Sequence, residues 1–374
     1  MWQSYRQVGR LSRRSRLCVL RVGTLLVYDA RVSVNSIEVG LARYVEATLA
    51  EATGVVVDEL ERIHGGASRE TFRLRLRYRQ DERDFERRLI LRRDPGGSLI
   101  DTERRTEFAA YRAVHGSPVP VPEVLWLEEG DDWLGAPFFV MEEVRGFESE
   151  FSQLTVSPYA ECAAQIGRSK WTVLGELAKL DPAKLDLDGA FEAPAPGDCW
   201  RVELEKWERE LDADERTPQP VTRAAIRWLR RNPPPPPERV SFVHGDFRSG
   251  NFLFDESGVQ AVLDWEMAHL GDPLEDLGWS LQPTWRVAKD DRVGGLLLRD
   301  EAISVWEAAS GRRVDPDALH WWELMACVKG QAIWVSAGKE YVEGSNKDAV
   351  LALSAWAVAL TQDRGTIEVM ERHR

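Results

Sequence analysis

Three polar side chains, set around two short apolar runs, are of the types that phosphoryl transfer requires. Asp246 lies three residues after the apolar run 242–243 ends, and Asn251 follows five residues later. A second apolar run, 261–263, leads to Asp264. Transfer from a magnesium nucleotide needs one carboxylate beside the acceptor hydroxyl and further oxygen ligands that hold the metal. We therefore predict a phosphotransferase site, since a tight turn between two core strands would need only a glycine and one aspartate.

The same stretch carries three motifs that resemble those of the aminoglycoside phosphotransferase and choline kinase superfamily. The motifs are HGDFRSGN at 244–251, LDWE at 263–266 and GDPLEDL at 271–277. They are similar to the family's catalytic loop, its metal-binding segment and the segment that follows. The resemblance implies that Asp246 is the catalytic base or the group that positions the acceptor. It also implies that Asn251 and Asp264 hold Mg²⁺ and that His244 is structural.

The family resemblance implies an α+β fold with two lobes, similar to that of protein kinases. A small five-stranded antiparallel sheet would form the N-lobe, and a larger, mainly helical C-lobe would carry the catalytic loop. We expect the N-lobe at 41–146, the C-lobe at 147–374 and a poorly packed extension at 1–40, where six arginines precede the first acidic residue. The motifs are most similar to the branch in which such kinase domains are joined to acyl-CoA dehydrogenases.

The composition is that of a soluble globular protein, because 43% of the 374 residues are hydrophobic and 30% are charged. No uninterrupted apolar run is long enough to cross a bilayer, so we expect no membrane insertion. Four cysteines without a C-x-x-C pair favour a reducing cytoplasm over a zinc site or a disulfide framework. The net charge of −13 lies entirely after Gly146 and argues against nucleic acid as a partner. Nothing in the sequence indicates an oligomeric state.

A glycine pair precedes the first clear strand. Gly65, Gly66 and Ser68 come just before 72–79, where apolar residues alternate with arginines, which predicts a half-buried strand with a basic solvent face. Glycines let backbone amides approach phosphate oxygens, and Ser68 adds a hydroxyl. The family has its phosphate-covering loop here, so the resemblance implies contacts with ATP. An ordinary hairpin turn would use the same glycines.

The lysine that kinases carry on their third strand is missing, because the chain has no lysine before Lys170. In the segment LILRR, the family register gives this place to Arg92, and Arg93 is the alternative. A guanidinium can bind phosphate through two nitrogens, so the replacement is compatible with nucleotide binding.

The helix predicted over 99–114 would supply the glutamate that pairs with this cation. Glu103 and Glu107 are four residues apart and share one helix face. The resemblance favours Glu107 as the partner of Arg92. The alternative is a surface glutamate that pairs with an arginine of its own helix.

The segment FFVMEEVRG at 138–146 resembles the family's hinge between the lobes. The resemblance implies that backbone groups from Glu142 to Val144 form hydrogen bonds with adenine. Met141 or Phe139 would line the adenine pocket.

Amphipathic spacing predicts that most of the remaining chain is helical. The predicted helices are 166–180, 200–211, 221–230, 296–309, 316–338 and 348–362. We expect four tryptophans in the core or a pocket lining: Trp321, Trp322, Trp334 and Trp356. His269 is interpreted as structural, and Asp272 and Asp276 are expected to cap or anchor the helix that follows them.

The sequence thus predicts a phosphotransferase that uses ATP and Mg²⁺ and has an alcohol group on a small molecule as its acceptor. The branch resemblance implies a hydroxyacyl or hydroxy-acid acceptor, whereas the acidic C-terminal part would attract an aminoglycoside or an amino alcohol. The missing lysine leaves a non-catalytic pseudokinase or nucleotide-binding module as an alternative. A metal-dependent hydrolase would leave the glycine-rich strand and the hinge unexplained.

Overall fold

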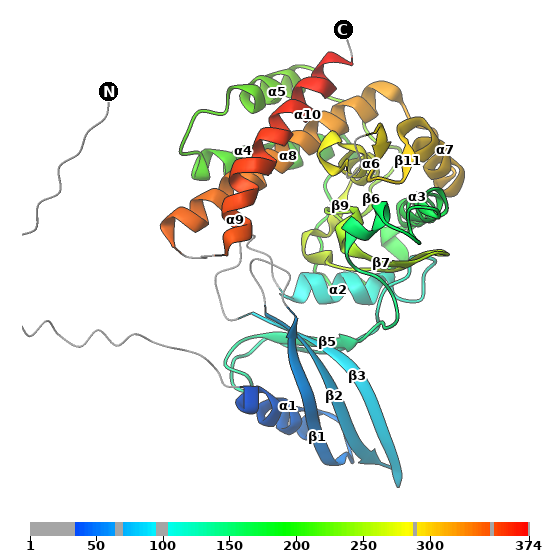
Figure 1. Cartoon of the computed structure of the whole chain (residues 1–374), viewed down its shortest axis with the longest axis vertical. Helices are drawn as coiled ribbons and strands as arrows, with labels where there is room; N and C mark the ends of the chain where they lie inside the picture. The colour runs from blue at the N-terminus through cyan, green and yellow to red at the C-terminus, as the bar shows by residue number, and fades with distance from the viewer. Residues whose placement is uncertain (1–33, 64–69, 95–103, 287–289, 345–347, 373–374) are drawn as a thin grey trace, which may run out of the picture.

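The computed structural model describes residues 34–63, 70–94, 104–286, 290–344 and 348–372. Its N-terminal part is a five-stranded antiparallel sheet in the order β1-β2-β3-β5-β4, and its C-terminal part is mainly helical (Figure 1). The strands are β1 Thr53–Ile63, β2 Glu70–Gln80, β3 Arg83–Arg93, β4 Val124–Glu128 and β5 Phe138–Glu142. This arrangement confirms the predicted α+β fold class.

The alternating sequence of β2 explains how the sheet buries one face. Phe72, Leu74, Leu76 and Tyr78 are buried, while the arginines between them are exposed or half-buried. The turn to β3 uses Asp81 and Glu82, both with positive φ, as a two-residue hairpin turn requires.

Helix α1, Val34–Thr48, packs against the apolar side of this sheet. It begins inside the segment 1–40 for which we expected poor packing, and Ile37 is only 2% exposed. That expectation is therefore wrong for the last residues of the segment. The helical spacing that predicted a start at Leu41 already holds four residues earlier, where Ile37 lies on the same face.

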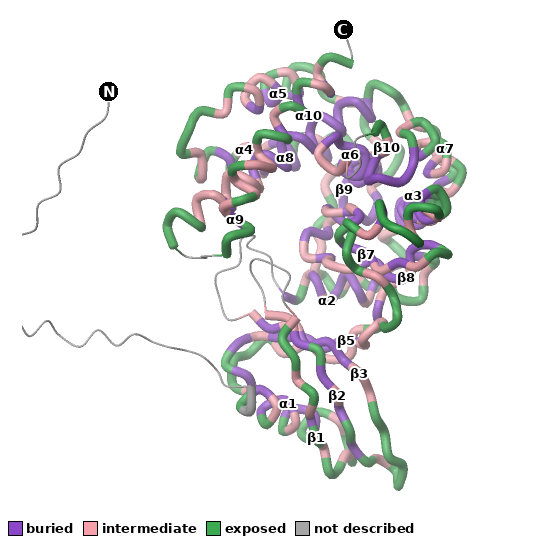
Figure 2. The backbone as a smooth tube through the Cα atoms, in the orientation of Figure 1, coloured by how far each residue is buried: buried purple, intermediate pink, exposed green. Residues whose placement is uncertain are grey.

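The helical part is organised around one long buried helix, α8. The helices are α2 Arg104–Val114, α3 Ala163–Lys179, α4 Cys199–Asp214, α5 Pro220–Arg231, α6 Leu274–Leu281, α7 Arg299–Ser310, α8 Pro316–Glu343, α9 Ala349–Leu353 and α10 Ala359–Glu371. Helix α8 packs against α4, α5, α6 and α10, and Figure 2 shows it buried along much of its length. Within the described part of the chain, no helix combines the length and the apolar content needed to span a bilayer.

Two expectations for the helical part are wrong. The predicted helix 296–309 begins only at Arg299, because Gly294 and Gly295 adopt positive φ and turn a small hairpin between β10 Arg292–Val293 and β11 Leu297–Leu298. Trp356 is 78% exposed instead of lying in the core or a pocket. It lies in a π-helical segment, Ser354–Val358, which shifts the side chains out of the 3.6-residue spacing that the expectation assumed.

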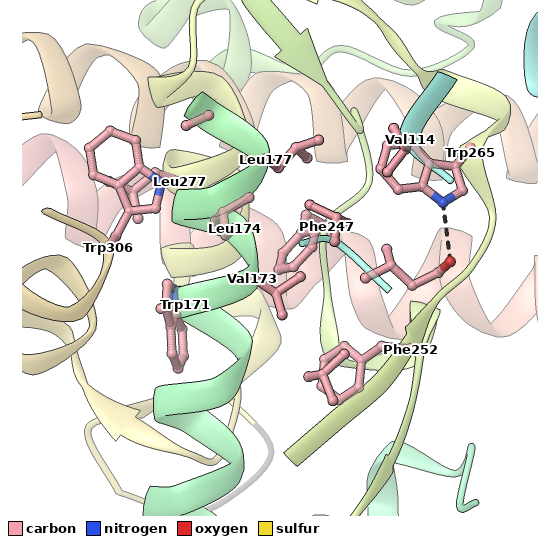
Figure 3. Close-up of a cluster of buried hydrophobic side chains, with 14 of the residues drawn as sticks. Val114, Trp171, Val173, Leu174, Leu177, Phe247, Phe252, Trp265, Leu277 and Trp306 are labelled. Carbon is pink, nitrogen blue, oxygen red and sulfur yellow. Dashed lines mark hydrogen bonds between the residues drawn. The ribbon is translucent and has the colours of Figure 1, made fainter. Parts of the chain in front are cut away.

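A cluster of buried apolar side chains packs against the predicted catalytic segment (Figure 3). Trp171 and Leu174 of α3 lie on one side of it, and Phe247, Phe252 and Trp265 come from the segment itself. Trp265 also donates a hydrogen bond from Nε1 to the Val262 carbonyl, at 3.1 Å. The apolar residues between the motif's polar ones therefore fix its backbone in place.

Candidate active site

A short hairpin brings Asn251 and Asp264 to the same end. Strands β7, Phe252–Asp255, and β8, Gly258–Val262, are antiparallel, and Phe252 lies opposite Val262. The residues just outside this pair are Asn251 on one strand and Leu263 on the other, and the Leu263 N–H donates to the Asn251 carbonyl at 2.8 Å. Asp264 follows directly, so the two predicted metal ligands lie next to one hairpin end.

The Asp246 carboxylate is held by three donors. Trp279 Nε1 donates to Oδ1 at 2.8 Å, and Arg248 Nε lies 3.1 Å from both oxygens. Asn251 Nδ2 donates to Oδ2 at 2.7 Å and also to the Asp246 carbonyl at 2.9 Å. The side chain keeps 15% exposure, so this carboxylate is oriented and still accessible.

The backbone before Asp246 is fixed from helix α6. The Asp276 carboxylate accepts from the His244 N–H at 2.7 Å and from the Gly245 N–H at 2.9 Å. Gly245 has φ +84°, and a Cβ there would lie 2.3 Å from the Met267 carbonyl oxygen, so only glycine fits. Asp276 thus anchors helix α6 to this loop, which is the second of the two roles expected for it. Asp272 caps this helix, because Oδ1 accepts from the Leu274 N–H at 2.9 Å.

His244 links the two motifs through both of its ring nitrogens. Nδ1 accepts from the Asp246 N–H at 3.0 Å, so the ring proton lies on Nε2, which donates to the Leu263 carbonyl at 3.0 Å. This ring connects the loop before Asp246 to the residue before Asp264.

Arg92 joins Glu107 and Asp264. Its Nη1 is hydrogen-bonded to the Glu107 carboxylate, and its Nη2 lies 2.9 Å from Asp264 Oδ1. Burial lowers the pKa of Arg92, but the carboxylates of Glu107 and Asp264 outweigh it and raise this pKa well above its usual value. The guanidinium therefore stays charged between the sheet, helix α2 and the end of the hairpin.

Arg93 points to the opposite face of the sheet, as the next residue on a strand must. Its Nε donates to the Leu134 carbonyl at 2.9 Å, and its Nη1 pairs with Glu70 at 2.6 Å. Of the two arginines in the segment LILRR, only Arg92 contacts Glu107 within the described part of the chain. Glu103 lies outside the described residues.

Asp264 has a left-handed backbone, with φ 66° and ψ 59°. This region is costly for residues other than glycine, and aspartate is one of the few that tolerate it. Its N–H donates to the Tyr111 hydroxyl at 2.8 Å, which helps to hold this conformation. Such a conformation often marks a functional site. At Asp264 it turns the chain away from the direction of strand β8.

The side chains at the hairpin end fit a hard divalent cation. The Asn251 amide nitrogen is bound to Asp246, which turns its Oδ1 away, and no described residue donates a hydrogen bond to that oxygen. The Asp264 side chain is 32% exposed. Carboxylate and amide oxygens are the donors that Mg²⁺ prefers.

The predicted nucleotide contacts are described only in part. Gly65, Gly66 and Ser68 lie outside the described residues. Met141 is 6% exposed on β5, and the Glu142 N–H already donates to the Glu123 carbonyl at 2.9 Å. Val144 follows the strand, and its N–H has no backbone acceptor among the residues that the structure describes.

Sequence reasoning missed two residues that touch Asp246. Arg248 lies within HGDFRSGN at a position for which neither the residue type nor the resemblance implied a role. Trp279 comes three residues after Asp276 on α6 and therefore lies on the same helix face. That spacing was the available signal, because both side chains reach the same loop.

An antiparallel five-stranded sheet next to this hairpin and loop is the arrangement of kinase-like phosphotransferases, and known proteins agree. A model of the phosphotransferase enzyme family matches residues 59–309, and the chain belongs to that family.

Its curated relatives include acyl-CoA dehydrogenase family members. Member 11 of Gallus gallus is 32% identical over 198 residues, which are 52% of this chain and 25% of that protein. Member 11 of Rattus norvegicus is 30% identical over 292 residues, which are 74% of this chain and 37% of that protein. The chain thus spans only about a quarter to a third of the length of these relatives.

Solved structures share the fold at low sequence identity. A Ralstonia eutropha protein described as an aminoglycoside phosphotransferase has a TM-score of 0.67 and 22% identity, over 89% of this chain and 98% of that one. A thermostable mutant of aminoglycoside phosphotransferase APH(4)-Ia in ternary complex with AMP-PNP and hygromycin B has a TM-score of 0.58 and 16% identity, with the same coverage. At these identities the likeness shows the fold alone.

Proposed function

We propose that this protein transfers the γ-phosphate of ATP to a hydroxyl group of a small metabolite. The observation that carries the proposal is the Asp246 carboxylate, which is oriented by three donors, accessible, and hydrogen-bonded to Asn251. A carboxylate in that position orients the acceptor hydroxyl and takes its proton as the new O–P bond forms.

The other residues have complementary roles in this proposal. Asn251 Oδ1 and the Asp264 carboxylate would hold Mg²⁺, which when bound neutralises charge on the phosphates. Arg92, kept in place by Glu107, would contact phosphate oxygens in the role of the missing lysine. Two groups would complete the nucleotide site: Gly65, Gly66 and Ser68 over the phosphates, and Met141, Glu142 and Val144 at the adenine.

The proposed acceptor is a hydroxyacyl compound or a hydroxy acid. Two observations support an anionic acceptor: the names of the relatives, which belong to an acyl-CoA dehydrogenase family, and the position of Arg248. This guanidinium lies beside Asp246, so an acceptor whose hydroxyl reaches Asp246 also comes close to a positive charge. Although Asp246 already pairs with its Nε, the guanidinium has further N–H donors that a carboxylate or phosphate group can accept from and that an ammonium group cannot use.

An aminoglycoside is the second candidate. It is favoured by the fold neighbours that bind aminoglycosides and by the net charge of −13. A net charge is spread over the solvated surface, whereas Arg248 acts within the site, so the local charge has more weight here.

A screen of ATP consumption tests the acceptor. Purified protein is given hydroxyacyl-CoA thioesters, free hydroxy acids, aminoglycosides and choline, each with and without Mg²⁺. We expect Mg²⁺-dependent turnover with the hydroxyacyl compounds or hydroxy acids. Preferential turnover of an aminoglycoside or choline would contradict the proposed acceptor. ATP binding without turnover of any acceptor would instead favour a nucleotide-binding module.

The role of Arg92 has its own test. Arg92→Ala is expected to raise the KM for ATP about tenfold or more, because the guanidinium that contacts phosphate is lost. Arg93→Ala is the matched control, since it removes a buried arginine that pairs with Glu70 on the other face. We expect this control to lower the melting temperature and leave the KM nearly unchanged. A larger KM effect in Arg93→Ala would show that the register is wrong by one residue.

A further inference from the structure

A group of charged residues, three of them buried and one half-buried, lies directly behind the loop that carries Asp246. We call it the Lys329 cluster, and its members are Lys329, Glu275, His269 and Glu203. Lys329 comes from the middle of α8 and is 2% exposed. Its Nζ donates a hydrogen bond to the Gly245 carbonyl and another to Glu275 Oε1, at 3.1 Å.

His269 is the second cation of the cluster. Its Nδ1 lies 2.9 Å from the Met267 carbonyl, and its Nε2 lies 2.9 Å from Glu275 and 3.5 Å from Glu203. These partners are acceptors only, so both ring nitrogens carry hydrogen and the ring is an imidazolium. Burial lowers the pKa of His269, but Glu275 and Glu203 outweigh it and raise this pKa to about 9.

The cluster is therefore balanced by its own side chains. Glu203, His269 and Glu275 bring their ligand atoms within 4.8 Å of one another, a geometry that could also hold a metal ion. Lys329 and the imidazolium already supply two positive charges against the two carboxylates, so a further cation is not needed for neutrality.

Lys329 is connected to Asp246 by two routes. The first is the Gly245 carbonyl, which belongs to the peptide unit that ends at the Asp246 nitrogen. The second is Trp279, because Lys329 Nζ lies 5.0 Å from the centre of its ring, within reach of a cation–π interaction. The same indole donates from Nε1 to Asp246 Oδ1 at 2.8 Å.

We propose that Lys329 is a positioning residue for phosphoryl transfer, which sets the direction of the Asp246 carboxylate through Gly245 and Trp279. The inference rests on the proposed function. A buried ion pair is seldom required for stability, since apolar residues of similar volume often stabilise as well or better. A role of its ammonium group in orienting the catalytic loop would explain why a lysine lies at the centre of α8.

Lys329→Met keeps most of the side-chain volume and removes the ammonium. We expect kcat to fall about 10- to 100-fold, since small misplacements of a reacting group have effects of that size. The KM for ATP and the affinity for the magnesium nucleotide should change less than about twofold, because Arg92 and Asp264 do not contact the cluster. An unchanged kcat in a folded variant would overturn the proposal.

Arg299→Met is the control for losing an ion-pair partner of a buried glutamate on the same helix. Arg299 donates to both oxygens of Glu323 on α8, at 2.9 and 2.8 Å, and Glu323 is fully buried. We expect this variant to have a lower melting temperature and an unchanged kcat. If the two variants lose only stability, and to a similar degree, then Lys329 is structural.

A double-mutant cycle tests the route through the indole. Trp279→Phe removes the N–H that binds Asp246 and keeps an aromatic ring. If Lys329 acts partly through Trp279, the loss of kcat in the double variant is smaller than the product of the two single losses. A fully multiplicative loss would exclude that route and leave only the Gly245 carbonyl.

A measurement that does not depend on turnover separates this inference from the proposed function. In protein labelled with ¹⁵N-tryptophan, the Trp279 indole signal is assigned by its absence in Trp279→Phe. We expect Lys329→Met to shift this signal and to speed its hydrogen exchange, whether or not an acceptor is known. An unchanged Trp279 signal would overturn the role of Lys329, whereas absence of turnover in the wild type would contradict only the proposed function.

Discussion

Asp246→Asn is expected to lower kcat by a factor on the order of 10² to 10⁴, the usual range for loss of a general base. The amide keeps the shape of the carboxylate and can still accept from Trp279, but it cannot take the proton of the acceptor hydroxyl. Steady-state turnover with the acceptor found in the screen measures this effect. The affinity for the magnesium nucleotide should remain close to that of the wild type. It is measured by the rise in melting temperature that the nucleotide causes.

Asp255→Asn is the matched control, because Asp255 is a nearby aspartate at the end of β7 that lies away from Asn251. Its Oδ1 accepts local hydrogen bonds from Ser257 and Gly258, away from Asp246. We expect this variant to keep the turnover of the wild type. Wild-type turnover in Asp246→Asn would remove Asp246 from the mechanism.

Asp264→Asn is expected to weaken Mg²⁺-dependent nucleotide binding about 10- to 100-fold. The loss of groups that hold or orient metal ligands has effects of that size in other proteins. The substitution removes a charged oxygen ligand and the partner of Arg92 Nη2. Calorimetric titration with ATP, in Mg²⁺ and in EDTA, measures the metal-dependent part of the affinity. An affinity that keeps its full Mg²⁺ dependence would show that the metal is bound elsewhere.

Local patterns in the sequence predicted the parts of the fold that local contacts determine. The alternation at 72–79 gave β2 because each side chain faces the side opposite to its neighbour. The same two-residue period explains why Arg92, and not Arg93, reaches Glu107. The motifs around Asp246 and Asp264 placed both residues beside one hairpin, since the hairpin is formed within twelve residues of sequence.

The contacts that orient Asp246 were harder to predict because they join distant parts of the chain. Trp279 is 33 residues from Asp246, and Lys329 is 84 residues from Gly245. A buried lysine on a helix whose middle is buried on every face leaves no periodic signal. The prediction that Trp356 is buried was wrong for the opposite reason. Its apolar character suggested burial, which the π-helical segment prevents.

The Nη1 and Nη2 atoms of Arg92 connect the sheet to the helical part through two charged hydrogen bonds. One nitrogen binds Glu107 on α2, and the other binds Asp264, 172 residues further along the chain. A lysine ammonium is a single centre and does not offer this fixed two-pronged geometry. Any widening of the space between the sheet and the hairpin must therefore separate Arg92 from Asp264. A motion that widened this space would therefore also change the electrostatic environment of the proposed metal ligand, Asp264.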